Sequence, residues 1–187
     1  NDESHGFHQQ LLPCGWATWG QKFLKYYDWD LTNLKTRTDI RKIKHKYRSK
    51  ALYRHQKYFI LKEFDRRNKK ERYSSWDYHM IFSVMDNDLL GICPKYNLIT
   101  NTGLDELSEH ISIKKKNIML DRFHMVPAHE LEFPLIHPKE IELNKYLDKK
   151  LSKKILPPIR NRFKGFLSRL FKKVLGVNFY NKLLRKI

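Results

Sequence analysis

The chain has 187 residues, and its 41% hydrophobic and 13% aromatic content suffices for the core of one globular domain, so disorder is not expected. It contains no run approaching the roughly 18 apolar residues that span a bilayer, which excludes a transmembrane helix in this sequence. Cys14 and Cys93 are the only cysteines and lie outside any CxxC pair, which argues against a disulfide framework or a thiolate zinc site. A reducing, cytoplasmic setting fits this usage.

The net charge of +18 is concentrated in two segments. Residues 35–72 hold 16 Lys or Arg against 4 acidic residues, and residues 152–187 hold 11 against none. The remainder is mildly acidic, a composition that suits a divalent cation.

The first six residues begin with Asn1 rather than Met and have the composition of a loop, so we expect the sequence to start inside a longer protein. Residues 13–20 begin at a proline and end at a glycine, which predicts a structured loop leading into a short helix near Gln21 to Tyr27. Residues 39–72 lack Gly and Pro and carry apolar side chains at helical spacing. They predict one broken helix or two consecutive helices.

Trp76, Met80 and Val84 recur at helical spacing and predict a helix from Trp76 to Met85, capped by Ser74 or Ser75. Asp77 would lie in its first turn. Two short apolar runs, Leu89 to Cys93 and Tyr96 to Thr100, predict a strand or strand pair ending at a turn around Asn101 to Gly103.

Residues 133–138 contain two prolines and predict an extended segment. Beyond Pro157 and Pro158, apolar residues form one helical stripe with Lys and Arg largely opposite. We therefore divide the chain into a domain of residues 1–151 and a basic amphipathic helical tail of residues 152–187. Such a tail would lie on an anionic membrane surface, at the inner face of the cytoplasmic membrane.

Three stretches in order carry a resemblance: Gly15-Trp16-Ala17-Thr18-Trp19, then Ser75-Trp76-Asp77-Tyr78-His79-Met80, then residues 92–103 with His110 downstream. Over residues 13–143 the chain resembles a bacterial family of GT-A type glycosyltransferases. That family is similar in this region to the eukaryotic N-acetylglucosaminyltransferase that begins complex N-glycan branching. The resemblance implies an α/β fold: the C-terminal, acceptor-side portion of a nucleotide-diphospho-sugar transferase whose donor-binding half would lie upstream of Asn1.

The resemblance also implies roles for single residues. Asp77 would be the general base, Gly15 and Trp16 would close over the acceptor and the donor's β-phosphate, and His110 would approach the diphosphate or the metal. The further substrate-binding residues would be Trp76, Tyr78, Asn101 and Gly103. The eukaryotic relative has two adjacent acids after its Trp, whereas Tyr78 follows Asp77 in this chain. The motif therefore fixes the position of the general base only to within one residue.

The chemistry explains this combination. An inverting transfer needs a carboxylate within about 3 Å of the acceptor hydroxyl to accept its proton. Mn²⁺ or Mg²⁺ would stabilise the leaving nucleoside diphosphate, with its main ligands expected upstream of Asn1.

Simpler interpretations exist for each residue. Trp76 and Asp77 alone are typical of a helix start, Gly15 and Trp16 of a tight packed turn, and His110 of an exposed loop. Asp28-Trp29-Asp30 and Asp86-Asn87-Asp88 match the Asp-x-Asp metal motif but follow the Gly-Trp loop, whereas the family's copy precedes it. The spacing of His124, His129 and His137 matches no helical zinc site.

Three functions follow from these patterns. The first is transfer of a sugar from a nucleotide sugar to a glycan or lipid-linked acceptor in cell-surface polysaccharide synthesis. The second is a basic nucleic-acid-binding module over residues 35–72. These residues match no known docking motif, which argues against nucleic acid as a partner. The third is a non-catalytic remnant that scaffolds other glycan enzymes.

Overall fold

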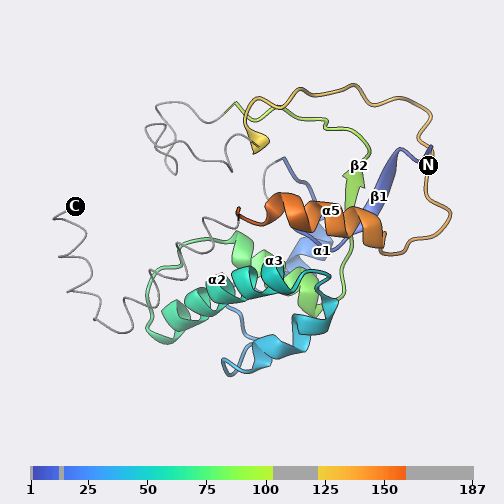
Figure 1. Ribbon diagram of the computed structural model, residues 1–187. Coiled ribbons are helices and arrows are strands. Elements are labelled where there is room, and N and C mark those ends of the chain that lie inside the picture. Colours follow the sequence, from blue (N-terminus) through green and yellow to red (C-terminus); the bar gives the residue numbers. More distant parts are fainter. Residues whose placement is uncertain (1, 13–14, 103–121, 159–187) are drawn as a thin grey trace. The chain divides into compact units, whose positions relative to one another are not determined.

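Helices α2 (Lys50–Asn68) and α3 (Asp77–Asp86) pack against each other in the computed structural model, beside a two-stranded sheet (Figure 1). The structure describes residues 2–12, 15–102 and 122–158. Contacts along the chain separate a unit Asn1–Leu156 from a unit Pro157–Ile187, and every described helix and strand lies in the first unit. No helix among the described residues is long and apolar enough to cross a membrane.

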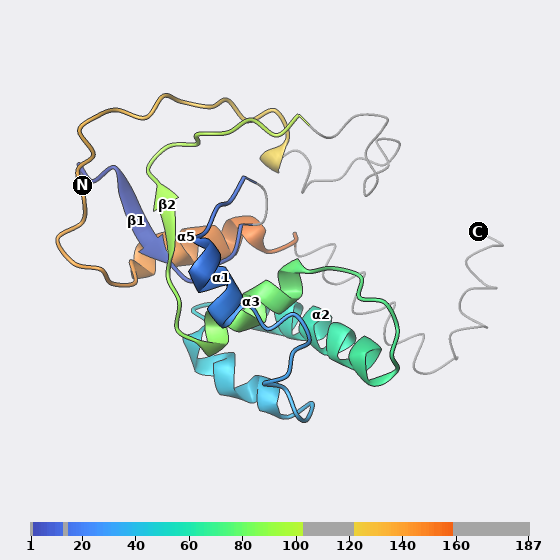
Figure 2. The same cartoon turned by 180° about the vertical axis from the view of Figure 1, so that it is seen from behind.

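The core lies between α2, α3 and the 3-10 helix η1 (Asp39–Lys46), which Figure 2 shows from the opposite side. The prediction of two consecutive helices within residues 39–72 is thereby confirmed, with a break near Ser49. That serine caps α2, because its side chain accepts a hydrogen bond from the Leu52 amide. The core side chains that are less than 2% exposed are Leu31, Leu34, Ile40, Ile43, Leu52, Ile60, Phe82 and Met85.

The strand β1 (His5–His8) pairs antiparallel with β2 (Gly91–Pro94). The prediction of a loop through residue 6 was wrong, because the composition of residues 5–8 does not reveal a partner strand so far along the chain. Both edges of β1 are used. One bonds to β2, and on the other the Phe7 carbonyl accepts a hydrogen bond from the Asn144 amide at 3.0 Å.

The second predicted strand, Tyr96 to Thr100, does not form. Instead, the side-chain amide of Asn97 donates to the carbonyls of Ile99, Val126 and Pro127 at 2.5, 3.3 and 2.9 Å. These bonds tie the segment to residues 126–129 rather than to a strand ladder. The competition of an Asn side chain with the backbone ladder explains the difference.

Helix α5 (Lys145–Ile155) begins at Asn144, whose side chain accepts a hydrogen bond from the Leu147 amide. The helix lies against β1 (Figure 1) and buries Asp148 and Ser152. The predicted start of the basic tail, residue 152, therefore falls inside α5. Residues 159–187, which hold most of that tail, lie outside the described residues.

Asp148 has no exposed surface, and its carboxylate accepts hydrogen bonds from the Gln9 amide at 3.0 Å and from the Gln10 side chain at 3.3 Å. We expect Asp148→Ala to lower the free energy of unfolding by about 1–3 kcal/mol, because both buried donors lose their acceptor. Urea unfolding measures this. The matched control is Lys149→Ala at the exposed neighbouring position, which should change stability by less than about 0.5 kcal/mol. Equal effects of the two changes would contradict the prediction.

Candidate functional site

Segments from all three stretches of the resemblance meet at the N-terminal end of α3. The ring of Trp16 stacks on that of Trp76, with 5.4 Å between centroids and 27° between planes. Gly15 has a φ of +66°, and a Cβ there would lie 2.0 Å from Cδ1 of Ile99. The turn at Gly15 and Trp16 therefore contacts both the start of α3 and the segment of residues 96–100.

Asp77 is the first residue of α3 and is half-buried. The Ser75 hydroxyl donates a hydrogen bond to its Oδ1. The amide dipoles of the helix N-terminus stabilise a negative charge at this position. Burial, and then the Asp77 charge, raise the pKa of the Tyr27 and Tyr78 hydroxyls, so the carboxylate lies near two phenols that stay protonated at neutral pH.

An exposed aromatic surface adjoins this carboxylate. Helix α1 (Gly20–Tyr26), which confirms the predicted short helix within one residue, buries none of its side chains. Its Phe23 contacts Trp16 at 6.4 Å and stacks on Tyr27 at 4.6 Å between ring centroids. Trp76 beside Asp77 is 45% exposed, and Trp19, the residue before α1, is 65% exposed.

Tyr78 is turned into the protein interior. Its ring stacks on Phe59 of α2, with centroids 4.7 Å apart and 9° between planes, and it packs against the core. The predicted substrate-binding role of Tyr78 remains a prediction, and the contact it makes in the structure is with α2.

A buried polar cluster lies below the start of α3. Glu63 of α2 and His79 of α3 are each 1% exposed, with His79 Nε2 4.0 Å from Glu63 Oε2. The Glu63 carboxylate accepts hydrogen bonds from the Ser74 amide, at 2.9 Å, and from the Ser74 hydroxyl. Ser74 is thus bound to α2 and does not cap α3. The residue before the helix is Trp76, so the predicted cap by Ser74 or Ser75 was wrong.

His79 is held by one hydrogen bond among the described residues. Its Nδ1 lies 2.6 Å from the Trp29 carbonyl, while Nε2 has no hydrogen-bond partner among the described residues. Burial lowers the pKa of His79, opposed by the Trp29 hydrogen bond and by the charges of Glu63, Asp28 and Asp30. The sequence did not predict this pair, because Glu63 and His79 lie on different helices and neither belongs to a recognisable motif.

The two Asp-x-Asp matches serve the fold. Asp28 accepts hydrogen bonds from the amides of Thr32 and Asn33, and Asp30 accepts one from the Tyr73 hydroxyl. Asp86 and Asp88 form ion pairs with two lysines of η1, Lys42 and Lys46, at 2.7 and 2.8 Å. Each carboxylate thus has a structural partner.

The three downstream histidines lie in separate contacts. His124 Nδ1 is 3.2 Å from the Asn101 carbonyl, the His129 ring tilts on Tyr96, and the His137 ring meets His5. No three His, Cys, Asp or Glu side chains within the described ranges converge as a metal site would require. The predicted residues Gly103 and His110 lie outside those ranges.

Asn101 belongs to the same segment as Ile99, the side chain that Gly15 contacts. Its carbonyl accepts a hydrogen bond from the Met125 amide at 3.2 Å, and the residue forms an isolated parallel bridge with His124. The structure thus brings Gly15, Trp16, Trp76 and Asp77 together, with Asn101 on an adjoining segment.

Comparison of the chain with protein-family models, with curated proteins and with solved structures finds no match. The relationship to GT-A glycosyltransferases therefore remains an expectation based on the sequence motifs.

Two buried histidines predict an acid-sensitive fold. Burial lowers the pKa of His8 and of His79 from the ordinary 6.5, so below that pH the unfolded chain binds more protons than the folded chain. We expect the free energy of unfolding to keep its neutral-pH value above pH 6.5 and to decrease as the pH falls from 6.5 through the lowered pKa values of the two histidines.

Urea unfolding between about pH 7.5 and about pH 5 measures this dependence. His79→Gln should flatten the pH dependence, whereas His45→Gln, at an exposed position of η1, should leave it unchanged. A stability that rises on acidification would contradict the prediction.

Proposed function

We propose that this chain is the acceptor-side portion of a nucleotide-sugar-dependent glycosyltransferase that acts in cell-surface polysaccharide synthesis, with Asp77 as the general base. The observation that carries the proposal is the stacking of Trp16 on Trp76 directly beside Asp77. These residues come from two sequence stretches that resemble one enzyme family, and a shared site requires them to be adjacent. Their proximity is independent of the motif match, which considered only their order along the chain.

The surroundings of Asp77 suit recognition of a sugar. A pyranose ring has an apolar C–H face that packs on an exposed indole, while its hydroxyls need polar partners. Trp76 offers such a face, and Asp77 is the next residue. A sugar seated on Trp76 would bring a hydroxyl to a carboxylate that is partly shielded from water, as a general base requires.

The leaving nucleoside diphosphate and its Mn²⁺ or Mg²⁺ belong to the same proposal. Within the described part of the chain no set of side chains fits a divalent cation, so no step is routed through the metal. In the proposed step, Asp77 accepts the proton of the acceptor hydroxyl as its oxygen attacks the anomeric carbon. The bond from that carbon to the diphosphate breaks with inversion.

Asp77→Asn in the full-length product of the gene tests the base. We expect turnover to fall roughly 10²–10⁴-fold with donor binding intact, because the amide retains the shape but accepts no proton. The assay follows nucleoside diphosphate release from candidate nucleotide sugars in the presence of acceptor. The matched control is Asp88→Asn, an exposed aspartate beyond the other end of α3, which should retain turnover.

Unchanged turnover in the Asp77→Asn protein would remove Asp77 as the base. Absence of turnover in the unmodified full-length protein, across donors and metals, would favour the non-catalytic scaffold. An equal loss in both variants would point to folding rather than chemistry, and urea unfolding of each variant checks this.

Membrane association through the basic tail is part of the proposal and is supported by sequence composition. Because α5 extends to Ile155, a deletion that tests the tail should begin after Leu156 rather than at residue 152. We expect the intact chain to sediment with vesicles that contain phosphatidylglycerol, to release them at high salt, and to lose binding when residues 157–187 are removed. Binding that is insensitive to both salt and deletion would contradict this.

A further inference from the structure

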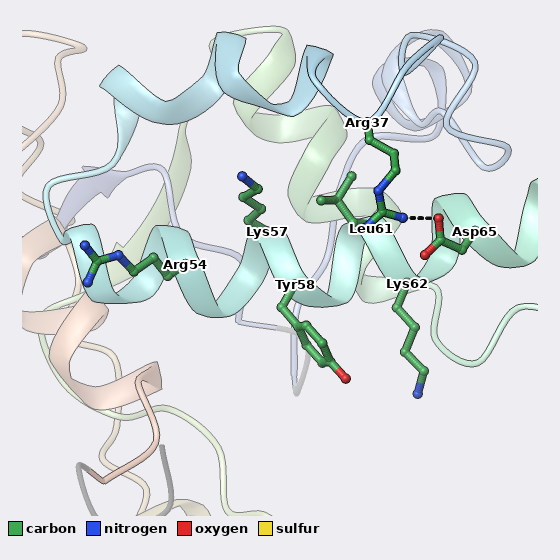
Figure 3. Close-up of a pocket in the computed structure, with 7 residues that line it drawn as sticks. All are labelled: Arg37, Arg54, Lys57, Tyr58, Leu61, Lys62 and Asp65. Carbon is green, nitrogen blue, oxygen red and sulfur yellow. Dashed lines mark hydrogen bonds and ion pairs between the residues drawn. The ribbon is translucent and has the colours of Figure 1, made fainter. Parts of the chain in front are cut away.

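The exposed face of α2 is hollowed by a groove of about 460 Å³. Figure 3 shows its lining: Arg54, Lys57, Tyr58 and Lys62 project from α2, and Arg37 reaches over from the segment before η1. Leu61, only 8% exposed, also lines the groove. The groove thus combines cationic walls with a small apolar surface.

The positive charge of this groove is largely uncompensated. Among the described residues that line it, the one carboxylate, Asp65, forms an ion pair with Arg37 (Figure 3). Within the described ranges, Arg54, Lys57 and Lys62 have no ion pair with any carboxylate. These three cations give the groove a net positive charge, which would attract a ligand with several negative charges.

The groove lies on the same packed pair of helices as the candidate site. The ring of Tyr58 meets that of Phe59 at 5.1 Å between centroids, and Phe59 in turn stacks on Tyr78. Tyr78 directly follows Asp77. These contacts run through the interior, so the groove and the candidate base belong to one packed pair of helices, α2 and α3.

The lining distinguishes between polyanions. Single-stranded nucleic acid is bound by a row of aromatic faces on which successive bases stack, and Tyr58 is the only aromatic side chain that lines this groove in the described part of the chain. A membrane presents a broad surface, to which a hollow is poorly matched. A flexible glycan with regularly spaced negative groups needs only cations along its path and a small apolar surface for its sugar rings.

We propose that the α2 groove binds an anionic glycan that carries carboxylate or phosphate groups, and that this glycan is the acceptor whose end reaches Asp77. Binding of an anionic glycan in the groove is independent of the proposed function, whereas its role as the acceptor rests on that function. The substrate class is then an acidic polymer recognised along its length, rather than by its terminal sugar alone.

The test measures binding of the full chain to hyaluronan oligosaccharides, with neutral dextran oligosaccharides of equal length and oligothymidylate of equal charge as comparison probes. The groove variant combines Arg54→Gln, Lys57→Gln and Lys62→Gln. The matched control combines Lys145→Gln, Lys149→Gln and Lys153→Gln, which removes the same charge from three exposed positions of α5. Urea unfolding establishes that both variants are folded.

We expect the groove variant to bind hyaluronan at least roughly tenfold more weakly, since three charge contacts are lost, and the control variant to bind as the unmodified chain does. Dextran should not bind. Equal weakening in both variants would mean that diffuse charge attracts the polymer and would overturn the proposal. Tighter, groove-dependent binding of oligothymidylate would overturn it in favour of nucleic acid.

Binding is measured without turnover, which separates this inference from the proposed function. The Asp77→Asn chain should bind hyaluronan normally. If the Asp77→Asn chain retains turnover while the groove variant loses hyaluronan binding, the groove is a glycan site whose ligand is not the acceptor for Asp77. If the Asp77→Asn chain loses turnover while the groove variant binds hyaluronan normally, only the groove inference is wrong.

Discussion

The buried carboxylate of Glu63 holds the start of α3, and the candidate site depends on that position. It binds the amide and hydroxyl of Ser74 two residues before Trp76, and it lies 4.0 Å from the His79 ring in the first turn of the helix. Glu63 holds Ser74 before Asp77, and the Trp29 carbonyl holds the His79 ring after it, so the first turn of α3 has little freedom. A buried carboxylate of this kind is costly unless its partners are in place, so it also selects one arrangement of α2 and α3.

The same pair of helices presents two surfaces of opposite character. At the N-terminus of α3, one carboxylate lies beside the exposed indole of Trp76, on which Trp16 stacks. On the exposed face of α2, cations line a hollow with a single paired acid. Tyr78 and Phe59 stack between the two helices beneath these surfaces. In the proposed enzyme, binding of the polymer along the α2 groove would raise the local concentration of the end that reacts.

Short-range physics explains which elements could be predicted. The helical spacing of Trp76, Met80 and Val84 placed Asp77 in the first turn of α3, and the lack of Gly and Pro in residues 39–72 indicated helices there. Strand β1 was missed because its four residues are too few to show an alternation of polar and apolar side chains, and because its partner, β2, lies far along the chain. Residues 96–100 look like a strand, yet Asn97 bonds elsewhere, which composition does not disclose.

The sequence by itself determined the order of the motifs, the position of Asp77 at a helix start and the concentration of cations in residues 35–72. Only the tertiary structure decided that Trp16 stacks on Trp76, that the Asp-x-Asp carboxylates have structural partners, and that four of the many cations line one groove. The physical reason is that local periodicity is set by backbone geometry within a few residues. Contacts between distant residues follow from how complete elements pack, and no single segment encodes them.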